Sequence, residues 1–275
     1  MPELPEVETV RRTLAPAVGA RITTVWDSAK PLHMQRKPPR AKLRALAGAQ
    51  ILAIRRHGKY LLVDTDRPQS LLVHLGMTGR FCIHGAADVR GTHTHLVLGL
   101  ADGRELRFTD ARRFGQLDVL ERAREREHPA LAVLGPDALT DGVDPAVLVA
   151  LARKRKTTLK AFVLDQSVLA GVGNIYASEA LWRAKLRPSK RSHRLTVASA
   201  KLLADAIHET IANALENGGT TLADFVAADG VKGENADYLW VYDRAGLPCL
   251  RCKSMIKRAV HQGRATYYCP TCQTA

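Results

Sequence analysis

The feature that most constrains the fold of this 275-residue chain is a set of four cysteines near its carboxyl end. Cys249 and Cys252 form one C-x2-C pair, Cys269 and Cys272 form a second, and sixteen residues separate the two pairs. Two thiolates from each of two tight turns, with a hairpin between the turns, suit a tetrahedral zinc site. The alternatives are disulfides, which a reducing compartment disfavours, and a redox pair, which a βαβ unit would accompany. The spacing therefore predicts one structural zinc ion that holds a small module in shape.

The amino-terminal half of the chain shows the periodicity of short strands. Residues 4–15 carry apolar side chains at helical spacing, and Pro16 and Gly19 end that predicted helix. The region 30–47 predicts a basic loop followed by a helix. Elsewhere, short β-branched segments are separated by Gly or Asp-Gly turns, and many such segments predict an antiparallel sandwich. These segments are 21–26, 50–56, 59–64, 71–75, 80–84, 94–100, 104–109 and 115–120.

From about residue 145 the apolar spacing becomes helical. The predicted helices are 145–153, 158–165, 174–185 and 196–217. Residues 121–127 mix both charges and predict a linker or an exposed turn, while the glycines of 218–237 predict a loop. We therefore expect an α+β chain in which a helix and a β-sandwich precede a helical domain and the cysteine module. The expected boundaries are 1–120 for the sandwich domain, 121–145 for a linker, 146–237 for the helical domain with its loop, and 238–275 for the zinc module.

Positive charge is in excess and is unevenly distributed. The net charge is +14 and the pI is near 9.9. Four basic tracts contain no acidic residue, at 28–63, 153–160, 183–201 and after Asp243. Charge for solubility usually mixes both signs, and an anionic membrane surface would call for a basic amphipathic anchor. The tracts therefore favour a surface that follows a phosphate backbone at several points, and we expect a nucleic-acid partner.

Neither a membrane span nor a secretion signal is indicated. The chain has no uninterrupted apolar stretch of the roughly 18 residues needed to span a bilayer. Its first residues are polar and acidic, unlike a signal peptide. We therefore expect a cytoplasmic protein with no membrane partner.

The sequence Met1-Pro2-Glu3 carries a candidate reactive group. If Met1 is removed, Pro2 becomes a free secondary amine with the carboxylate of Glu3 beside it. Such an amine can form a covalent iminium with a sugar carbon, and an α-amine with a pKa of about 7.7–8.0 is partly unprotonated near neutrality. Glu3 could then transfer protons to the sugar or to the leaving group. The alternative is a frayed terminus without function.

Turns that contain glycine carry further candidates, each with a purely structural alternative. Lys59 follows a glycine that permits a tight turn, although a lysine there can be merely solvated. Arg112 and Phe114 share a turn from which a guanidinium could pair with an orphaned base and a ring could enter the base stack, unless Phe114 belongs to the core. Met77 lies at a tip between glycines. Asn174 follows two glycines before a helix, as a phosphate cradle or as a simple cap.

Together these residues resemble the formamidopyrimidine-DNA glycosylase family of bacterial base-excision repair enzymes. The matching motifs are PELPEVE (2–8), HGKYLL (57–62), HLGMTGR (74–80), TDARRFG (109–115), GVGNIYASEAL (171–181), GGTTLADF (218–225) and QGRATYYC (262–269). Leu4 favours this branch over endonuclease VIII relatives, which begin PEGPE. The resemblance implies an N-terminal helix and antiparallel β-sandwich, then a helix-two-turn-helix domain with a four-cysteine zinc finger.

The resemblance also implies an activity, its residues and its partner. The chain would remove 8-oxoguanine and formamidopyrimidines from damaged double-stranded DNA and cleave the strand by β,δ-elimination, as a monomer without a nucleotide cofactor. The loop 218–237 would fold over the everted lesion. The implied catalytic residues are Pro2 as Schiff-base nucleophile, Glu3 as proton donor, Lys59 for β-elimination and Arg264 for δ-elimination and phosphate binding. The implied DNA-binding residues are the gap-filling Met77, Arg112 and Phe114, together with His93, Arg155 (lysine in relatives), Lys160 and Asn174.

Two other functions stay open from the residues alone. A non-catalytic regulator with a zinc module would not need a processed Pro-Glu terminus, and a nicking assay separates it from an enzyme. An endonuclease VIII-like enzyme would prefer oxidised pyrimidines. A comparison of duplexes that contain 8-oxoguanine opposite C with duplexes that contain thymine glycol separates that enzyme from a purine-specific one.

Overall fold

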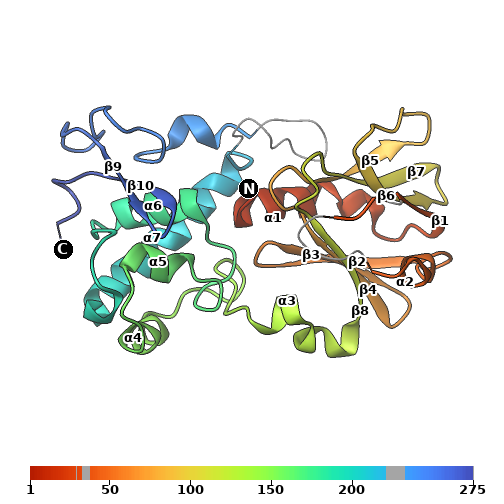
Figure 1. The fold of residues 1–275 in the computed structure, drawn as a ribbon, viewed down its shortest axis with the longest axis horizontal. Helices are drawn as coiled ribbons and strands as arrows, with labels where there is room; N and C mark the ends of the chain where they lie inside the picture. Colours follow the sequence, from red (N-terminus) through yellow and green to blue (C-terminus); the bar gives the residue numbers. More distant parts are fainter. Residues whose placement is uncertain (29, 33–37, 221–232, 275) are drawn as a thin grey trace. The chain divides into compact units, whose positions relative to one another are not determined.

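The computed structural model describes residues 1–28, 30–32, 38–220 and 233–274. The chain divides into two compact units, one formed by Met1–Ala132 with Asn217–Glu234 and the other by Val133–Glu216 with Asn235–Ala275. The first is rich in strands and the second in helices, so the predicted α+β class is confirmed (Figure 1). Within the described ranges, no helix is long and apolar enough to cross a membrane.

The first unit is an antiparallel β-sandwich preceded by a helix. Helix α1 (Leu4–Thr13) leads through the 3-10 turn η1 (Ala15–Ala17) into the strands. The described strands of this unit form two four-stranded sheets, ordered β1-β6-β7-β5 and β2-β3-β4-β8, which Figure 1 shows as two layers. Every strand predicted from the sequence is confirmed, with ends within two residues. The strands are β1 (Ile22–Asp27), β2 (Ile51–His57), β3 (Tyr60–Thr65), β4 (Gln69–His74), β5 (Arg80–Gly85), β6 (Thr94–Leu100), β7 (Arg104–Thr109) and β8 (Gln116–Glu121).

The core of this unit gathers one apolar face of each sheet. Leu61 and Val63 of β3 are fully buried in the same cluster as Leu96 and Leu98 of β6, as their alternation predicts. Helix α1 contributes Val7, Val10 and Leu14 to that cluster. Each of these side chains stabilises the fold by about 1.5–3 kcal/mol relative to exposure. The burial therefore holds α1, and the chain terminus before it, on the sandwich.

Three short helices complete the first unit. Helix α2 (Arg40–Arg44) is the helix predicted at the end of the basic region. The charged segment predicted as a linker or turn is the exposed 3-10 helix η2 (Arg122–Glu127), followed by α3 (Pro129–Ala132). The position of η2 is fixed because its Glu125 accepts hydrogen bonds from Arg55 of β2, at 2.6 and 3.1 Å.

The second unit combines helices with a small hairpin. The predicted helices are confirmed as α4 (Pro145–Arg153), α5 (Leu159–Leu164), α6 (Asn174–Arg183) and α7 (Val197–Glu216). Asp144 and Thr158 cap α4 and α5, because their side chains accept backbone N–H groups of the first turn. The remaining elements are η3 (Ser192–Arg194), η4 (Asn235–Tyr238), β9 (Lys257–His261) and β10 (Arg264–Tyr268). Strand β10 packs against α6.

Candidate functional site

The amino-terminal turn is ordered, which removes the alternative of a frayed terminus. Glu3 is the N-cap of α1, and its N–H donates to the Glu6 carboxylate at 2.8 Å, as in a capping box. Pro5 suits the first turn of a helix, and both carboxylates lie at the positive end of the helix dipole. Pro2 is buried and Glu3 is only 3% exposed. The fold therefore holds a carboxyl-bearing residue beside Pro2 in a fixed backbone.

Glu6 also contacts the chain just before the predicted glycine-rich loop. Its other carboxylate oxygen accepts the N–H of Thr220 at 2.8 Å. Gly218 and Gly219 have φ values of +70° and +83°, a region that glycine adopts at little cost. Most of the loop that the family resemblance implies over the lesion, residues 221–232, lies outside the described residues. The start of that loop is thus bonded to the first turn of α1.

Lys59 is buried, and a buried ion pair fixes the turn that carries it. Its exposure is 7%, so it is not a merely solvated lysine. Arg56 donates from Nε to Glu8 of α1 at 3.1 Å and from Nη1 to the Gly58 carbonyl at 3.0 Å. Removal of one partner of a buried ion pair costs about 3–5 kcal/mol, because the other charge is left uncompensated. Besides core packing, a buried ion pair that the sequence patterns did not indicate therefore joins helix α1 to the Lys59 turn.

The charge of Lys59 affects His74 on β4. Burial and the Lys59 ammonium lower the pKa of His74 to about 4, so its imidazole is neutral at pH 7. The ring of His74 contacts the ring of Tyr60, with 4.7 Å between the centroids, and its Nδ1 accepts the N–H of Gly76 at 3.1 Å. His74 thus joins the surroundings of Lys59 to the turn that carries Met77.

The predicted gap-filling residues lie at or near the surface of the first unit. Met77 is 37% exposed, Arg112 is exposed and Phe114 is half-buried. The guanidinium carbon of Arg112 lies 4.7 Å from the centroid of the Phe114 ring, at cation–π distance. His93 is also exposed. An apolar side chain, a ring and a guanidinium on adjoining turns have the chemistry to enter a base stack and to bond a base edge.

In the second unit, Lys160 and Asn174 hold one backbone carbonyl. Lys160 is fully buried, and its Nζ donates to Ser178 Oγ at 2.9 Å and to the Ala265 carbonyl at 3.0 Å. Nδ2 of Asn174 donates to the same carbonyl at 3.0 Å. The structural alternative for Asn174, a simple cap, does not hold, because Gly173 is the N-cap of α6. These side chains therefore support the hairpin at the residue next to Arg264.

A basic cleft of about 540 Å³ lies in the second unit beside that hairpin. Its lining includes Arg155, Lys156, Thr157, Asp165, Gln262 and Arg264. Arg155 is partly neutralised, since its Nε lies 3.4 Å from the Asp165 carboxylate. Among the described residues, the exposed guanidinium of Arg264 has no hydrogen-bond or ion-pair partner. Free cations around a cleft suit the phosphates of a nucleic-acid strand.

The four cysteines of the second unit converge as their spacing predicts. Their Sγ atoms lie within 4.8 Å of one another, with 4.0 Å between Cys249 and Cys272 and 3.4 Å between Cys252 and Cys269. Zn–S bonds of 2.3 Å in a tetrahedron place the sulfur atoms roughly 3.8 Å apart. The geometry therefore fits one zinc ion bound by four thiolates, a closed site whose role is structural.

The cysteine module packs on helix α6. Cys249 and Cys269 are buried in an apolar cluster with Trp182 of α6 and with Val241 and Tyr267. Glu179 of α6 accepts three backbone N–H groups of the segment that leads into the module, those of Trp240, Val241 and Tyr242. The module is thus continuous with the helical core of its unit. Nothing in the local sequence pattern marks Glu179 for this contact, which joins residues about 60 positions apart.

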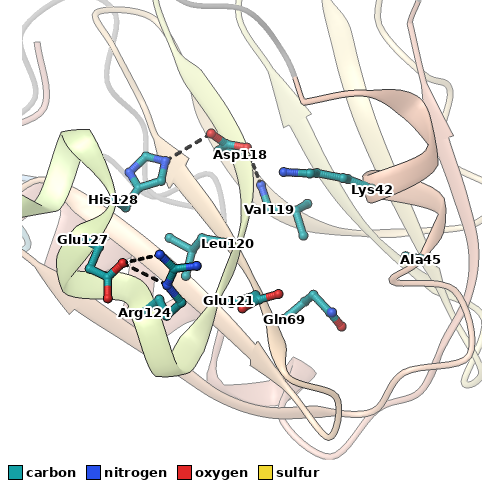
Figure 2. Close-up of a pocket in the computed structure, with 10 residues that line it drawn as sticks. All are labelled: Lys42, Ala45, Gln69, Asp118, Val119, Leu120, Glu121, Arg124, Glu127 and His128. Carbon is teal, nitrogen blue, oxygen red and sulfur yellow. Dashed lines mark hydrogen bonds and ion pairs between the residues drawn. The ribbon is translucent and has the colours of Figure 1, made fainter.

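A separate cavity of about 410 Å³ lies beside β8 in the first unit (Figure 2). Its charged side chains largely pair with one another, His128 with Asp118 at 3.1 Å and Arg124 with Glu127 at 2.6 Å. Lys42 of α2 lines the other side. The lining contains none of the predicted catalytic, DNA-binding or metal residues, so this cavity is not part of the candidate site.

Three protein-family models match the chain in order along its length. Residues 1–117 match the formamidopyrimidine-DNA glycosylase N-terminal domain, and residues 134–226 match the H2TH domain of the same glycosylase. Residues 246–275 match the zinc finger found in FPG and IleRS. The sandwich, the helical region and the cysteine module thus each match one of these three domains.

Relatives and solved structures are similar over nearly the whole chain. The formamidopyrimidine-DNA glycosylase of Cereibacter sphaeroides (strain ATCC 17029) is 42% identical over 283 residues, which cover 99% of this chain and all of that protein. The MutM (Fpg) protein of Thermus thermophilus is 40% identical, with a TM-score of 0.87 over 99% of this chain and 98% of that one. The Lactococcus lactis Fpg in complex with DNA that contains Fapy-dG is 32% identical, with a TM-score of 0.89 over 99% of this chain and 100% of that one.

Proposed function

The chain belongs to the formamidopyrimidine-DNA glycosylase family, and we propose that it excises oxidised purines from double-stranded DNA and then cleaves the strand. The observation that carries this proposal is the full-length similarity to enzymes of that name, with all three domains in the same order. The Lactococcus lactis relative has been crystallised with Fapy-dG DNA and with abasic DNA. A lesion and an abasic site are the substrate and the intermediate that such an enzyme handles.

Pro2 is the proposed nucleophile. Removal of Met1 frees its nitrogen as a secondary amine, which attacks C1′ of the damaged nucleotide. The N–C1′ bond forms as the glycosidic bond to the base breaks, and Glu3 supplies a proton to the sugar or to the leaving base. The C1′–O4′ bond then breaks as O4′ takes a proton and the amine nitrogen loses its own, and the product is an iminium that links the opened sugar to the protein. The buried, capped position of Glu3 supports this role, because it fixes the carboxyl group beside Pro2.

Strand cleavage follows from the iminium. Its positive nitrogen acidifies C2′, so loss of a C2′ proton expels the 3′ phosphate, and a second elimination expels the 5′ phosphate. Lys59 is the proposed group for the first step and Arg264 for the second. The ion pair of Arg56 with Glu8 supports the assignment of Lys59, since it ties the Lys59 turn to the helix that begins after Pro2 and Glu3.

The DNA-binding residues deal with extrusion of the damaged base. Flipping a base out of the stack costs a few kcal/mol, least for a damaged pair. Met77 and Phe114 are proposed to fill the gap, while Arg112 bonds the orphaned base. Phosphate contacts are proposed at His93, Arg155 and Arg264. Lys160 and Asn174 are proposed to support DNA binding by holding the Ala265 carbonyl, next to Arg264, through hydrogen bonds. The basic tracts supply non-specific affinity, and we propose that the enzyme acts as a monomer on DNA in the bacterial cytoplasm.

Cleavage of two lesion types tests the proposal against its rivals. We expect the purified protein to nick a duplex with 8-oxoguanine opposite C at a rate at least about tenfold above that for thymine glycol, the scale of discrimination that a shaped pocket provides. Single-turnover rates on labelled duplexes, with an undamaged duplex as control, give the comparison. Faster cleavage of thymine glycol would indicate an endonuclease VIII-like enzyme, and binding without nicking would indicate a regulator.

A further inference from the structure

Two turns of the first unit carry the three residues assigned to the gap in the DNA. One turn, residues 75–79, carries Met77, and the other, residues 110–115, carries Arg112 and Phe114. The backbones pack closely, since a Cβ at Gly76 would lie 2.5 Å from the backbone of Phe114. The two turns are more than thirty residues apart in sequence, yet side chains join them directly.

Thr78 joins the two turns because its hydroxyl group both donates and accepts a hydrogen bond. Its Oγ1 donates to Oδ1 of Asp110 at 2.5 Å and accepts the backbone N–H of Arg112 at 3.2 Å. The first bond ends on a carboxylate and is of the stronger, charge-assisted kind. The second acts on the backbone of the residue whose side chain is assigned to the orphaned base.

Asp110 is itself held on several sides. It is 1% exposed, and its Oδ2 accepts the N–H of Gly115 at 2.7 Å. Its own N–H donates to the His93 carbonyl at 2.9 Å, and its carbonyl is bonded to Nε2 of His95 at 3.0 Å. The Asp110 carboxylate that accepts the Thr78 hydroxyl is therefore shielded from solvent, and its backbone is hydrogen-bonded to His93 and His95. Arg113 has a φ of +57°, so this turn keeps a conformation that its sequence alone disfavours.

We propose that Thr78 is a positioning residue for recognition of the base opposite the lesion, and that its hydroxyl sets the backbone of Arg112 against the Asp110 anchor. The inference rests on the proposed function and adds a residue to it. A guanidinium discriminates between bases only when its donors meet the base edge at a fixed place and angle. The guanidinium of Arg112 already lies over Phe114, so one shift of this backbone would displace both side chains.

Three substitutions at Thr78 test the proposal. Thr78→Val keeps the side-chain shape and removes the hydroxyl, Thr78→Ser keeps the hydroxyl, and Thr78→Ala removes the hydroxyl without adding an apolar group. The measured quantity is the ratio of single-turnover excision rates for 8-oxoguanine opposite C and opposite A. We expect this ratio to fall about tenfold in the valine and alanine variants, within the range of one good base contact, and to stay near the wild-type value in the serine variant. Borohydride trapping on a pre-formed abasic site checks that each variant is folded and reactive.

The outcomes separate this inference from the proposed function. Wild-type protein that fails to excise 8-oxoguanine would contradict the proposed function itself. If the wild-type protein excises the lesion but the valine and alanine variants keep the wild-type ratio of rates opposite C and opposite A, only the role of Thr78 is overturned. Equal rates opposite C and A in the wild type, or the same loss in the serine variant as in the valine variant, would also overturn that role. If the valine variant unfolds, the alanine and serine variants make the comparison.

Discussion

A Glu3→Gln variant is expected to excise 8-oxoguanine about 10²–10⁴-fold more slowly, the usual contribution of a positioned general acid, and still to cleave a pre-formed abasic site. Glutamine keeps the size of the side chain and an oxygen acceptor at the N-cap of α1, so the terminal turn should persist. At an abasic site no base has to leave, and the amine of Pro2 can react without that proton. Single-turnover rates on the two duplexes measure the difference.

The control for this experiment is Glu3→Asp, which keeps a carboxyl group on a shorter side chain. It should recover part of the excision rate that glutamine loses, because the acid is present but displaced. Thermal unfolding compares the folding of the variants. If Glu3→Gln lowered excision and abasic-site cleavage by the same factor, Glu3 would be part of the fold of the terminus and not the proton donor.

Loss of the zinc site is expected to have the second large effect, on DNA affinity. Cys269→Ser removes one of four thiolates, and structural zinc contributes about 10–16 kcal/mol to the folding of comparable modules. The hairpin that carries Arg264 should become disordered. The hydrogen bonds from Lys160 and Asn174 to the Ala265 carbonyl should be lost as well. Affinity for lesion DNA should then fall by at least about tenfold, and the slope of log K against log salt should become shallower by about one for each lost phosphate contact.

Cys82→Ser is the matched control for the zinc variant. Cys82 is also buried, but it lies in β5 of the other unit and outside the metal cluster. This variant should keep one zinc per chain and the wild-type salt slope. Arg264→Ala should keep the zinc and show a milder loss of affinity together with a slower second elimination. A Cys269→Ser protein with wild-type affinity and salt slope would show that the module has no part in DNA binding.

Local pattern predicts most of the elements because burial on one face imposes it. Leu61 and Val63 alternate along β3 and lie in the sandwich core, whereas Leu62 between them is buried in a separate cluster with Leu72 and Leu120. The cysteine spacing is informative for a similar reason, since a tetrahedral site requires two short turns. In each case the physical constraint acts within a few residues, so it is visible in the sequence.

Contacts between segments far apart in the sequence could not be predicted from local pattern. Lys160 belongs to a basic tract that predicted exposure, yet every residue of α5 from Leu159 to Val163 is buried. Its ammonium donates hydrogen bonds to Ser178 Oγ and to the Ala265 carbonyl, which compensate for its burial. The bond between Thr78 and Asp110 and the ion pair of Arg56 with Glu8 likewise join segments that the chain brings together only on folding. No periodicity of the sequence encodes such pairings, and residue type alone does not reveal them.

The most direct test of the central claim is to trap the covalent intermediate and find the residue that carries it. The wild-type enzyme is mixed with 8-oxoguanine DNA in the presence of borohydride, which reduces an iminium to a stable amine, and the linked peptide is mapped by mass spectrometry. We predict that the sugar is attached to Pro2, in an amino-terminal peptide that lacks Met1. An adduct on Lys59, or trapping by a chain that retains Met1, would contradict the assignment of Pro2 as the nucleophile.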